Sequence, residues 1–402
     1  MSVHRELPAP GVLSSGWRLD EEIVFLNHGS FGACPLAVMD FRKELLAGIE
    51  RNPMDFLLQD YQPLLEEVLH RLESFTGAQS GSIIIVENAT TAVNTILANL
   101  PVKTGDTLLV TDQEYFSSAN ALQVLAMRKG LRVRKVALPW PMSEQAIIEA
   151  FAEAAEAGAR YALVDHVVSS TGMVLPLKRI ISLLGSMGVE TVVDGAHGPG
   201  QLDLQLEGLG CMAYTGNCHK WLCSPRSAAL LYVRPDFQEG FLPLQVSHLP
   251  EDFQTGLSAF QLRFRWNGTP DPTPALSIPF AMDHMASLVK GGWEGIRKRN
   301  RSLALKARDM LCEALDVAPP CPDSMVGSMA SVELPSANPA GPRDIQWMDP
   351  LQARLRSDYG IVVPVTEIQG RTRRLIRVSA QLYNSPEQYR YLVGCLLELL
   401  GK

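Results

Sequence analysis

The sequence predicts an α/β protein built on a mostly parallel sheet, with a smaller second unit towards its C-terminal end. Between residues 83 and 216, short apolar runs alternate with segments of helical periodicity, which is the pattern of βαβ units. The chain has 402 residues, more than one typical domain. Hydrophobic residues make up 46% of it, enough to bury a parallel sheet on both faces.

The first part of the chain is predicted to be irregular and then helical. Residues 1–24 contain several Pro and Gly residues, and we expect this segment to lie on the surface near the small domain. The glycines within residues 27–32, Asn-His-Gly-Ser-Phe-Gly, indicate a tight turn. Residues 39–49 and 62–76 then show apolar side chains at helical spacing, which predicts two helices.

The central part supplies the predicted sheet. Apolar, β-branched runs predict strands at residues 83–86, 106–111, 132–138, 161–165, 191–193, 211–214 and 227–233. Amphipathic segments predict helices at residues 88–100, 119–129, 143–157 and 177–187.

The last part is predicted to begin with a loop and to end as the smaller α+β unit. Residues 263–274 are rich in Pro and Gly, which is typical of a loop. Helices are expected at residues 277–289, 293–315, 349–359 and 386–400, and strands at 329–334, 361–365 and 374–379.

Two polar residues mark the ends of neighbouring predicted strands. Asp194 ends the strand at 191–193, and Lys220 follows the next strand. Side chains at such positions face one crevice, where open α/β sheets bind their ligands. Pyridoxal phosphate uses this pair of groups, because a lysine forms a Schiff base with its aldehyde and an aspartate keeps its ring nitrogen protonated. Taken singly, the aspartate is equally well explained as a turn or cap residue and the lysine as a solvated charge.

A predicted helix start offers an anion site. Thr90 and Thr91 open the helix at 88–100, where free N–H groups and the helix dipole favour phosphate. Simple capping by Asn or Thr explains the same residues. The sequence contains no GxxxxGK[ST] run, so a nucleotide P-loop is not indicated.

Several motifs together resemble one family. The segments DGAHG, NCHKWLCSPR, NHGSFG and RVS…YN resemble those of the class V aminotransferase family, within fold type I of the pyridoxal phosphate enzymes. The subgroup that they resemble is the isopenicillin N epimerase-like proteins, and the likeness runs from about Phe25 to the C-terminus. The resemblance implies a large domain over residues 25–275, with a seven-stranded sheet between helices. It also implies a small domain over residues 276–402, and a homodimer that shares its active sites.

The resemblance also implies the site. The catalytic residues would be Lys220 and Asp194, and the lysine would also act as the base at Cα. The phosphate of the cofactor would be contacted by Thr90, Thr91, Asn217 and His219. Tyr115 would lie on the face of its ring, and Ser169 and His197 would lie near its 3-oxygen. Thr269 of the neighbouring subunit would also contact the cofactor. Many relatives have Asn where this chain has Ser169. The amino-acid substrate would be held by Arg377 at its carboxylate, and by Asn27, His28 and Ser30.

The reaction stays open between several types. Removal of the Cα proton serves epimerisation, β-elimination and transamination alike; the resemblance favours an epimerase-like enzyme, with a C–S lyase as the alternative. Epimerisation needs an acid opposite the lysine, for which Tyr115 and Cys218 are candidates. A non-catalytic protein of the same fold is an alternative of another class. Cys211, Cys218, His219 and Cys223 also suggest a zinc site, but their spacing fits no common motif, and we expect no metal.

Composition excludes several other classes. A formal net charge of −7, without a basic stripe, argues against a nucleic-acid partner. No stretch reaches about 18 apolar residues without a charge, so we expect no membrane helix. The short apolar run at the N-terminus does not resemble an export signal. With seven scattered cysteines, this predicts reduced thiols in the cytoplasm.

Overall fold

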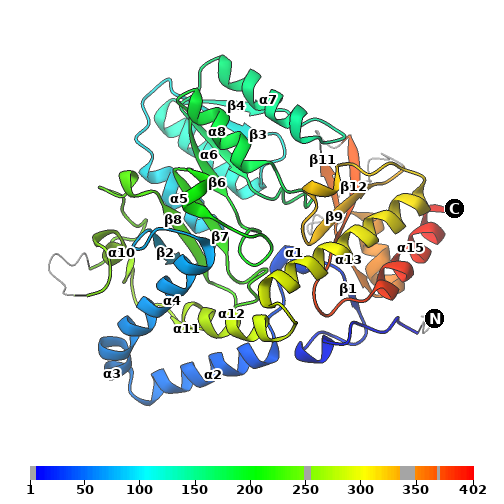
Figure 1. The fold of residues 1–402 in the computed structure, drawn as a ribbon, viewed down its shortest axis with the longest axis horizontal. Helices are drawn as coiled ribbons and strands as arrows, with labels where there is room; N and C mark the ends of the chain where they lie inside the picture. Colours follow the sequence, from blue (N-terminus) through cyan, green and yellow to red (C-terminus); the bar gives the residue numbers. More distant parts are fainter. Residues whose placement is uncertain (1–5, 249–254, 336–348, 369–371) are drawn as a thin grey trace.

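The computed structural model describes residues 6–248, 255–335, 349–368 and 372–402. Its centre is a seven-stranded sheet with the order β2-β8-β7-β6-β5-β3-β4 (Figure 1). The strands are β2 (Ile83–Val86), β3 (Thr107–Thr111), β4 (Arg132–Val136), β5 (Tyr161–Asp165), β6 (Glu190–Asp194), β7 (Ala213–Asn217) and β8 (Ala229–Val233). The pairs from β4 to β7 are parallel, and β8 runs antiparallel to both β7 and β2. The predicted mostly parallel sheet is confirmed.

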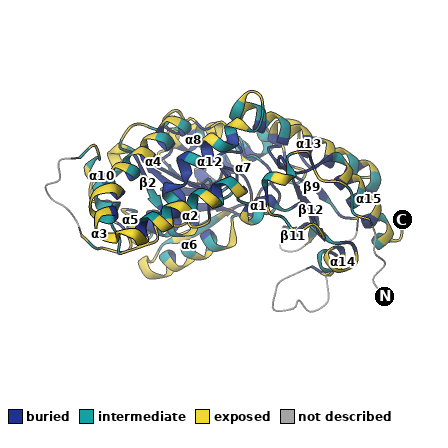
Figure 2. Ribbon diagram, turned by 90° about the horizontal axis from the view of Figure 1, so that it is seen from below, coloured by how far each residue is buried: buried dark blue, intermediate teal, exposed yellow. Residues whose placement is uncertain are grey.

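The strands are apolar because both faces of the sheet are covered. In β5, Tyr161 and Leu163 join one hydrophobic core, whereas Ala162 and Val164 join the other. Successive side chains of a strand point to opposite faces, so an uninterrupted apolar run is what a doubly covered strand requires. Figure 2 shows the buried sheet between layers of partly exposed helices.

Different helices contribute to the two cores. Helices α5 (Ala89–Asn99) and α6 (Phe116–Lys129) contribute to one, and α7 (Glu144–Glu156) and α8 (Leu177–Ser186) to the other. The helix α4 (Tyr61–Thr76) adds its apolar stripe to the second core. Near it lie α2 (Leu36–Arg51), η2 (Phe56–Asp60), α11 (Thr273–Leu276) and α12 (Ile278–Ser287). The shorter helices of this part are α1 (His28–Phe31), α3 (Pro53–Asp55), α9 (Leu206–Leu209), η3 (Pro235–Phe237) and α10 (Ala259–Phe264).

A second, antiparallel sheet lies beside the first (Figure 1), with the order β11-β12-β9. Its strands are β9 (Met329–Glu333), β11 (Val365–Ile368) and β12 (Arg373–Ser379). The helices of this part are α13 (Gly292–Leu315), η4 (Asp323–Met325), α14 (Pro350–Tyr359) and α15 (Pro386–Leu400). This is the predicted α+β unit, and its strand β12 carries Arg377.

The N-terminal segment contacts this second unit. The segment contains η1 (Ser14–Gly16) and β1 (Val24–Phe25), and β1 pairs in parallel with β10 (Ile361–Val362). The amide of Gly11 donates to the carbonyl oxygen of Tyr383 at 2.8 Å. The domain limits at residues 24 and 275 stay a prediction, and the pairing of β1 extends the contact slightly past the first limit.

Three predicted elements differ from the structure. The turn at residues 27–32 contains one helical turn, α1, and closes at Gly32 with φ of 70°. The strand predicted at 211–214 lies at Ala213–Asn217 instead. The strand predicted at 361–365 is two strands, because β10 pairs with β1 while β11 pairs with β12. In the described ranges, every helix is too short or too polar to cross a bilayer.

Candidate active site

The predicted site residues gather at one edge of the large sheet. Asp165 ends β5, Asp194 ends β6 and Asn217 ends β7. Lys220 follows three residues after Asn217. Because parallel strands end at the same edge, these side chains share one crevice, as expected for an open α/β sheet.

Lys220 has a buried environment that favours its neutral form. Burial lowers the pKa of Lys220 to about 8; the charge of Arg377 acts in the same direction, while Asp194 and Asp165 oppose the shift. The Lys220 Nζ lies 3.2 Å from Nε2 of His197. Trp221 donates its indole N–H to the other ring nitrogen of His197 at 3.4 Å. Nε2 therefore carries the proton of the neutral imidazole and can donate to Nζ when Lys220 is in its neutral form.

Asp194 is buried but receives two hydrogen bonds. The hydroxyl of Ser118 donates to its Oδ2 at 2.7 Å, and the backbone N–H of Ala196 donates to its Oδ1 at 3.0 Å. Burial raises the pKa of Asp194, and these two donors and Lys220 counteract it. Ser118 was not predicted from the sequence. The feature that could have identified it is its place in the first turn of the helix that follows β3.

The start of α5 brings three predicted residues together. Asn217 accepts a hydrogen bond from the backbone N–H of Ala89 at 2.9 Å, so the end of β7 is tied to the first residue of α5. Asn88 accepts from the N–H of Thr91 at 2.9 Å, and Ser117 donates to the hydroxyl of Thr90 at 3.3 Å. Thr90 is exposed. The site therefore has a helix N-terminus at one end.

Arg377 enters from the second sheet and has no acidic partner among the described residues. It is 3% exposed, and burial lowers its pKa to about 10. Its Nη2 donates to Oδ1 of Asn27 at 3.1 Å and to Oγ of Ser30 at 3.0 Å, and its Nη1 donates to the carbonyl oxygen of Ser169. Its Nε has no hydrogen-bond partner among the described residues. Asn27, Ser30 and Ser169 are thus brought together around one guanidinium.

Other predicted residues lie elsewhere. His28 is fully buried, with Nδ1 2.9 Å from the hydroxyl of Tyr383 and Nε2 2.9 Å from the carbonyl oxygen of Lys220. Both ring nitrogens lie beside protein atoms, which places His28 behind the lysine, and its predicted contact with the substrate stays a prediction. His219 is partly buried, and its Nδ1 faces the carbonyl oxygen of Ala228 at 3.3 Å.

Two further predicted cofactor contacts lie at the surface. Tyr115 precedes α6 and is 46% exposed. Thr269 is exposed and lines a separate cavity of about 350 Å³ with Tyr61, Glu87 and Asp271. None of the residues that line this cavity belongs to the cluster around Lys220, so the chain alone does not bring Thr269 to its own lysine.

The cysteines do not form the alternative zinc site. In the described part of the chain, Glu114, Asp165 and Asp194 are the His, Cys, Asp or Glu side chains that lie close enough to share one ion. Cys218 is fully buried in a hydrophobic core, and burial raises its pKa to about 12. Cys218 is therefore excluded as an acid that faces a substrate.

Comparison with known proteins agrees with this arrangement. Residues 34–392 match the family described as aminotransferase class-V. Isopenicillin N epimerase of Amycolatopsis lactamdurans is 35% identical over 398 residues, which cover 95% of this chain and 96% of the relative. A probable chloroplastic L-cysteine desulfhydrase of Arabidopsis thaliana is 29% identical over 396 residues, which cover 93% of this chain and 82% of the relative.

A solved structure supports the fold. The cystine C–S lyase C-DES, in complex with its reaction product cysteine persulfide, aligns with a TM-score of 0.77 at 19% identity, over 94% of this chain and 97% of that protein. The family match covers most of the chain, and the predicted resemblance is confirmed. The chain belongs to the class V aminotransferase family, whose members are pyridoxal-phosphate-dependent enzymes.

Proposed function

We propose that this protein is a pyridoxal-phosphate-dependent, epimerase-like enzyme that removes and returns the Cα proton of an amino acid. The observation that carries the proposal is the buried amine of Lys220, with a pKa of about 8, within electrostatic reach of both Asp194 and Arg377. A nucleophilic amine, an acid for a ring nitrogen and a guanidinium for a carboxylate are the groups that such an enzyme needs.

The residues fit the cofactor. Asp194 keeps two hydrogen-bond donors, which favour its ionised form and allow it to hold a protonated ring nitrogen. The start of α5, with Thr90, Thr91 and Asn217, offers a helix dipole to a phosphate. The cofactor, when bound, supplies an aldehyde that reacts with amines and a ring that accepts electrons from Cα.

Each of the chain's own residues at the site then has a separate role. With cofactor and substrate bound, Lys220 in its neutral form would take the proton from Cα. The proton on His197 Nε2 points at the lysine nitrogen and favours its neutral form. Arg377, positioned by Asn27 and Ser30, accepts the substrate carboxylate in a bidentate arrangement. His28 fixes the backbone of Lys220, and Ser169 supplies a carbonyl to the arginine.

A C–S lyase is the second candidate. Epimerisation needs a proton donor on the face opposite Lys220, and burial excludes Cys218, which leaves Tyr115. β-Elimination needs no second acid at Cα, since the leaving sulfur departs from Cβ. The similarity to L-cysteine desulfhydrases supports this candidate, while the higher identity to isopenicillin N epimerases favours the first. That these relatives are enzymes argues against a non-catalytic protein.

The two candidates are separated by one experiment. The holoenzyme is incubated with a panel of amino acids in deuterated water, beside K220A and, as a control, K178A, whose lysine is exposed. Deuterium at Cα with loss of optical activity supports the epimerase, whereas pyruvate and ammonia from a β-substituted substrate support the lyase. A keto acid derived from the substrate would indicate transamination. Equal turnover by K220A and the natural enzyme would refute both candidates.

We further propose a cytoplasmic homodimer with shared active sites. All seven cysteines are free, which suits a reducing compartment. Large apolar side chains are exposed at the surface, which suits a subunit interface; they include Phe31, Met54, Leu58 and Phe116. Thr269 would reach the phosphate bound by the neighbouring subunit. Light scattering of the purified protein gives the subunit number, and a monomer at micromolar concentration would refute the dimer.

A further inference from the structure

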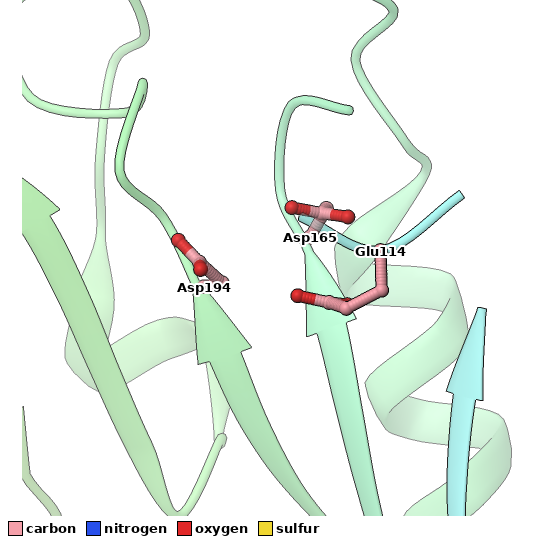
Figure 3. A group of neighbouring side chains, drawn as sticks. All are labelled: Glu114, Asp165 and Asp194. Carbon is pink, nitrogen blue, oxygen red and sulfur yellow. The ribbon is translucent and has the colours of Figure 1, made fainter. Parts of the chain in front are cut away.

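Two carboxyl groups lie directly beside Asp194, and the reaction proposed above gives them no role. Glu114 follows β3, and Asp165 ends β5. Oxygens of Glu114, Asp165 and Asp194 all lie within 4.8 Å of one another. Figure 3 shows Glu114 reaching across the end of β5, with its carboxyl group beside Asp165 and turned towards Asp194.

The three carboxyl groups differ in their hydrogen bonds. Asp194 receives donors from Ser118 and Ala196. Both oxygens of Glu114 and the Oδ2 of Asp165 are buried and have no partner at good hydrogen-bond geometry among the described residues; the backbone N–H of Tyr115 is a minor influence on both groups. Leaving an ionised carboxylate buried without donors is costly, by several kcal/mol. A proton placed between Glu114 and Asp165 removes this problem, since one carboxyl group then donates and the other accepts.

We propose that Glu114 and Asp165 share one proton. The single negative charge left on this acid pair is then a positioning element, which helps to hold the proton of the cofactor's ring nitrogen at the end of the ring that faces Asp194. The inference rests on the proposed function. Asp194 is then the ionised group that faces the cofactor, and the acid pair, Glu114 with Asp165, lies behind it. Two carboxyl groups sharing one site bind a proton in this way because they cannot both ionise at close range.

The surrounding charges agree with one proton on the pair. Burial, with the charge of Asp194, raises the pKa of Asp165 well above its usual value, and raises that of Glu114 likewise; the backbone N–H of Tyr115 opposes both shifts. Lys220 and Arg377 are the cations that reach the site, and Asp165 raises the pKa of Lys220. His197 and His166 stay neutral, because burial lowers the pKa of each. Two cations are thereby matched by Asp194 and one further negative charge.

The shared proton predicts which variants keep the negative charge of the acid pair and which lose it. In E114Q, Asp165 ionises and accepts a hydrogen bond from the new amide; in D165N, Glu114 does the same. Each single variant therefore keeps one negative charge and one hydrogen bond. Only the double variant E114Q/D165N loses the charge. Glu153, exposed on α7, gives the control E153Q.

The first readout is the pH midpoint of the visible absorbance of the bound cofactor. We expect E114Q, D165N and E153Q to match the natural enzyme, and the double variant to shift to lower pH by about one unit. A unit charge roughly 10 Å away at an effective dielectric constant of about 20 has an effect of this size. A full shift in each single variant would mean that the pair carries two charges, and no shift in any variant would mean that it carries none. Either result overturns the proposal.

The second readout needs no cofactor. Infrared difference spectra of the apoprotein should show a protonated carboxyl band that is absent from both single variants and from the double variant. A band that survives in the single variants, or one absent from the natural apoprotein, contradicts the shared proton. Failure of the natural protein to bind pyridoxal phosphate would refute the proposed function alone, because the infrared result would still stand.

Discussion

At the residue scale, Arg377 is a buried guanidinium with polar neighbours and, in the part of the chain that the structure describes, no acidic partner. A buried charge without a partner is costly in the apoprotein, and a substrate carboxylate would remove that cost. The other two arginines described on β12 differ, since Arg373 pairs with Glu333 at 2.6 Å and Arg374 pairs with Asp349 at 2.7 Å. Arg373 and Arg374 are therefore paired with acidic residues of the protein itself, and Arg371 lies outside the described residues. Under the proposed function, recognition of the substrate carboxylate would therefore depend on Arg377.

We expect R377K to lower kcat/KM for the amino-acid substrate by about 100-fold, close to 3 kcal/mol, because lysine keeps the charge but cannot bind a carboxylate through a planar fork. Steady-state kinetics measure the loss. The control is R128K, whose arginine is exposed on α6. The variant should react with an amine that lacks the carboxylate as fast as the natural enzyme does. An equal loss of kcat/KM for the amino acid and for the amine would show that Arg377 does not bind the substrate carboxylate.

At the element scale, the single turn α1 connects the N-terminal segment to the catalytic lysine. His28 lies between Tyr383 and the backbone of Lys220, and burial lowers its pKa to about 4. The usual value of 6.5 returns on unfolding. Between pH 6.5 and 4 the unfolded chain therefore binds a proton that the folded chain does not bind. The stability that neutral His28 provides is present above pH 6.5 and decreases as the pH falls towards 4.

We expect the free energy of unfolding of the natural apoprotein to fall more steeply with acid than that of H28Q, by about 3 kcal/mol over this window. Urea denaturation at pH 7 and at pH 4.5 measures the difference. Buried His166 and His197 also act in this direction, so only the comparison between the two proteins isolates His28. H248Q replaces an exposed histidine and should behave like the natural protein. Parallel pH profiles for all three would contradict the role of His28.

The N-terminus of α5 gives a second test at this scale. Asn217 accepts the N–H of Ala89, and an aspartate would accept it equally well. N217D should therefore leave the apoprotein as stable as before, since a negative charge is favourable at a helix start. The added charge should repel a phosphate, and we expect about 10-fold weaker binding of pyridoxal phosphate, near 1.4 kcal/mol. Thermal unfolding and fluorescence titration measure the two quantities.

The matched control for this test is S143D. Ser143 is the N-cap of the separate helix α7 and accepts the N–H of Ala146, so its side chain, like that of Asn217, accepts a backbone N–H at a helix start. Binding of pyridoxal phosphate by S143D should equal that of the natural protein. If N217D binds the cofactor as tightly as S143D does, the phosphate lies elsewhere.

Strand positions in the large sheet were predictable wherever packing alone selects the residues. The strands β2 and β5 are short apolar runs buried on both faces, and both were predicted at their observed limits. The strand β7 was placed too early, because Thr215, Gly216 and Asn217 look like a turn in sequence. They are buried nonetheless, and Thr215 satisfies its hydroxyl by donating to the carbonyl oxygen of Leu230 at 3.0 Å. Hydrogen bonds between distant segments leave no periodicity in the sequence.

The same reason explains which residues of the site could be predicted from the sequence and which could not. Asp194 and Lys220 could be found because strand ends and family motifs mark them. The sequence does not indicate that Glu114 and Asp165 approach Asp194, because only the order of the strands brings them together. It likewise does not indicate that His28 packs behind Lys220, 192 residues away. Residues that act through another side chain were therefore missed.

At the scale of the whole molecule, one chain alone does not bring the predicted phosphate contact Thr269 to its own Lys220. Thr269 lines its own cavity, apart from Lys220, and is exposed. If it serves the neighbouring subunit, each active site combines Lys220 of one chain with Thr269 of the other. Symmetric dimers make such sharing reciprocal, so each subunit both gives and receives a threonine.

If the active sites are shared in this way, mixing two inactive variants should restore part of the enzyme activity. K220A lacks the amine in every site, and T269D places a negative charge at every proposed phosphate contact. In a mixed dimer, one site receives both defects and the other receives none. Random exchange of subunits makes about half of the dimers mixed, so roughly a quarter of the natural activity should return. Activity is measured after mixing differently tagged proteins, and capture through both tags confirms that mixed dimers form. Mixed dimers without recovered activity would mean that each site is complete within one chain, and that the predicted contact of Thr269 with the partner's phosphate is wrong.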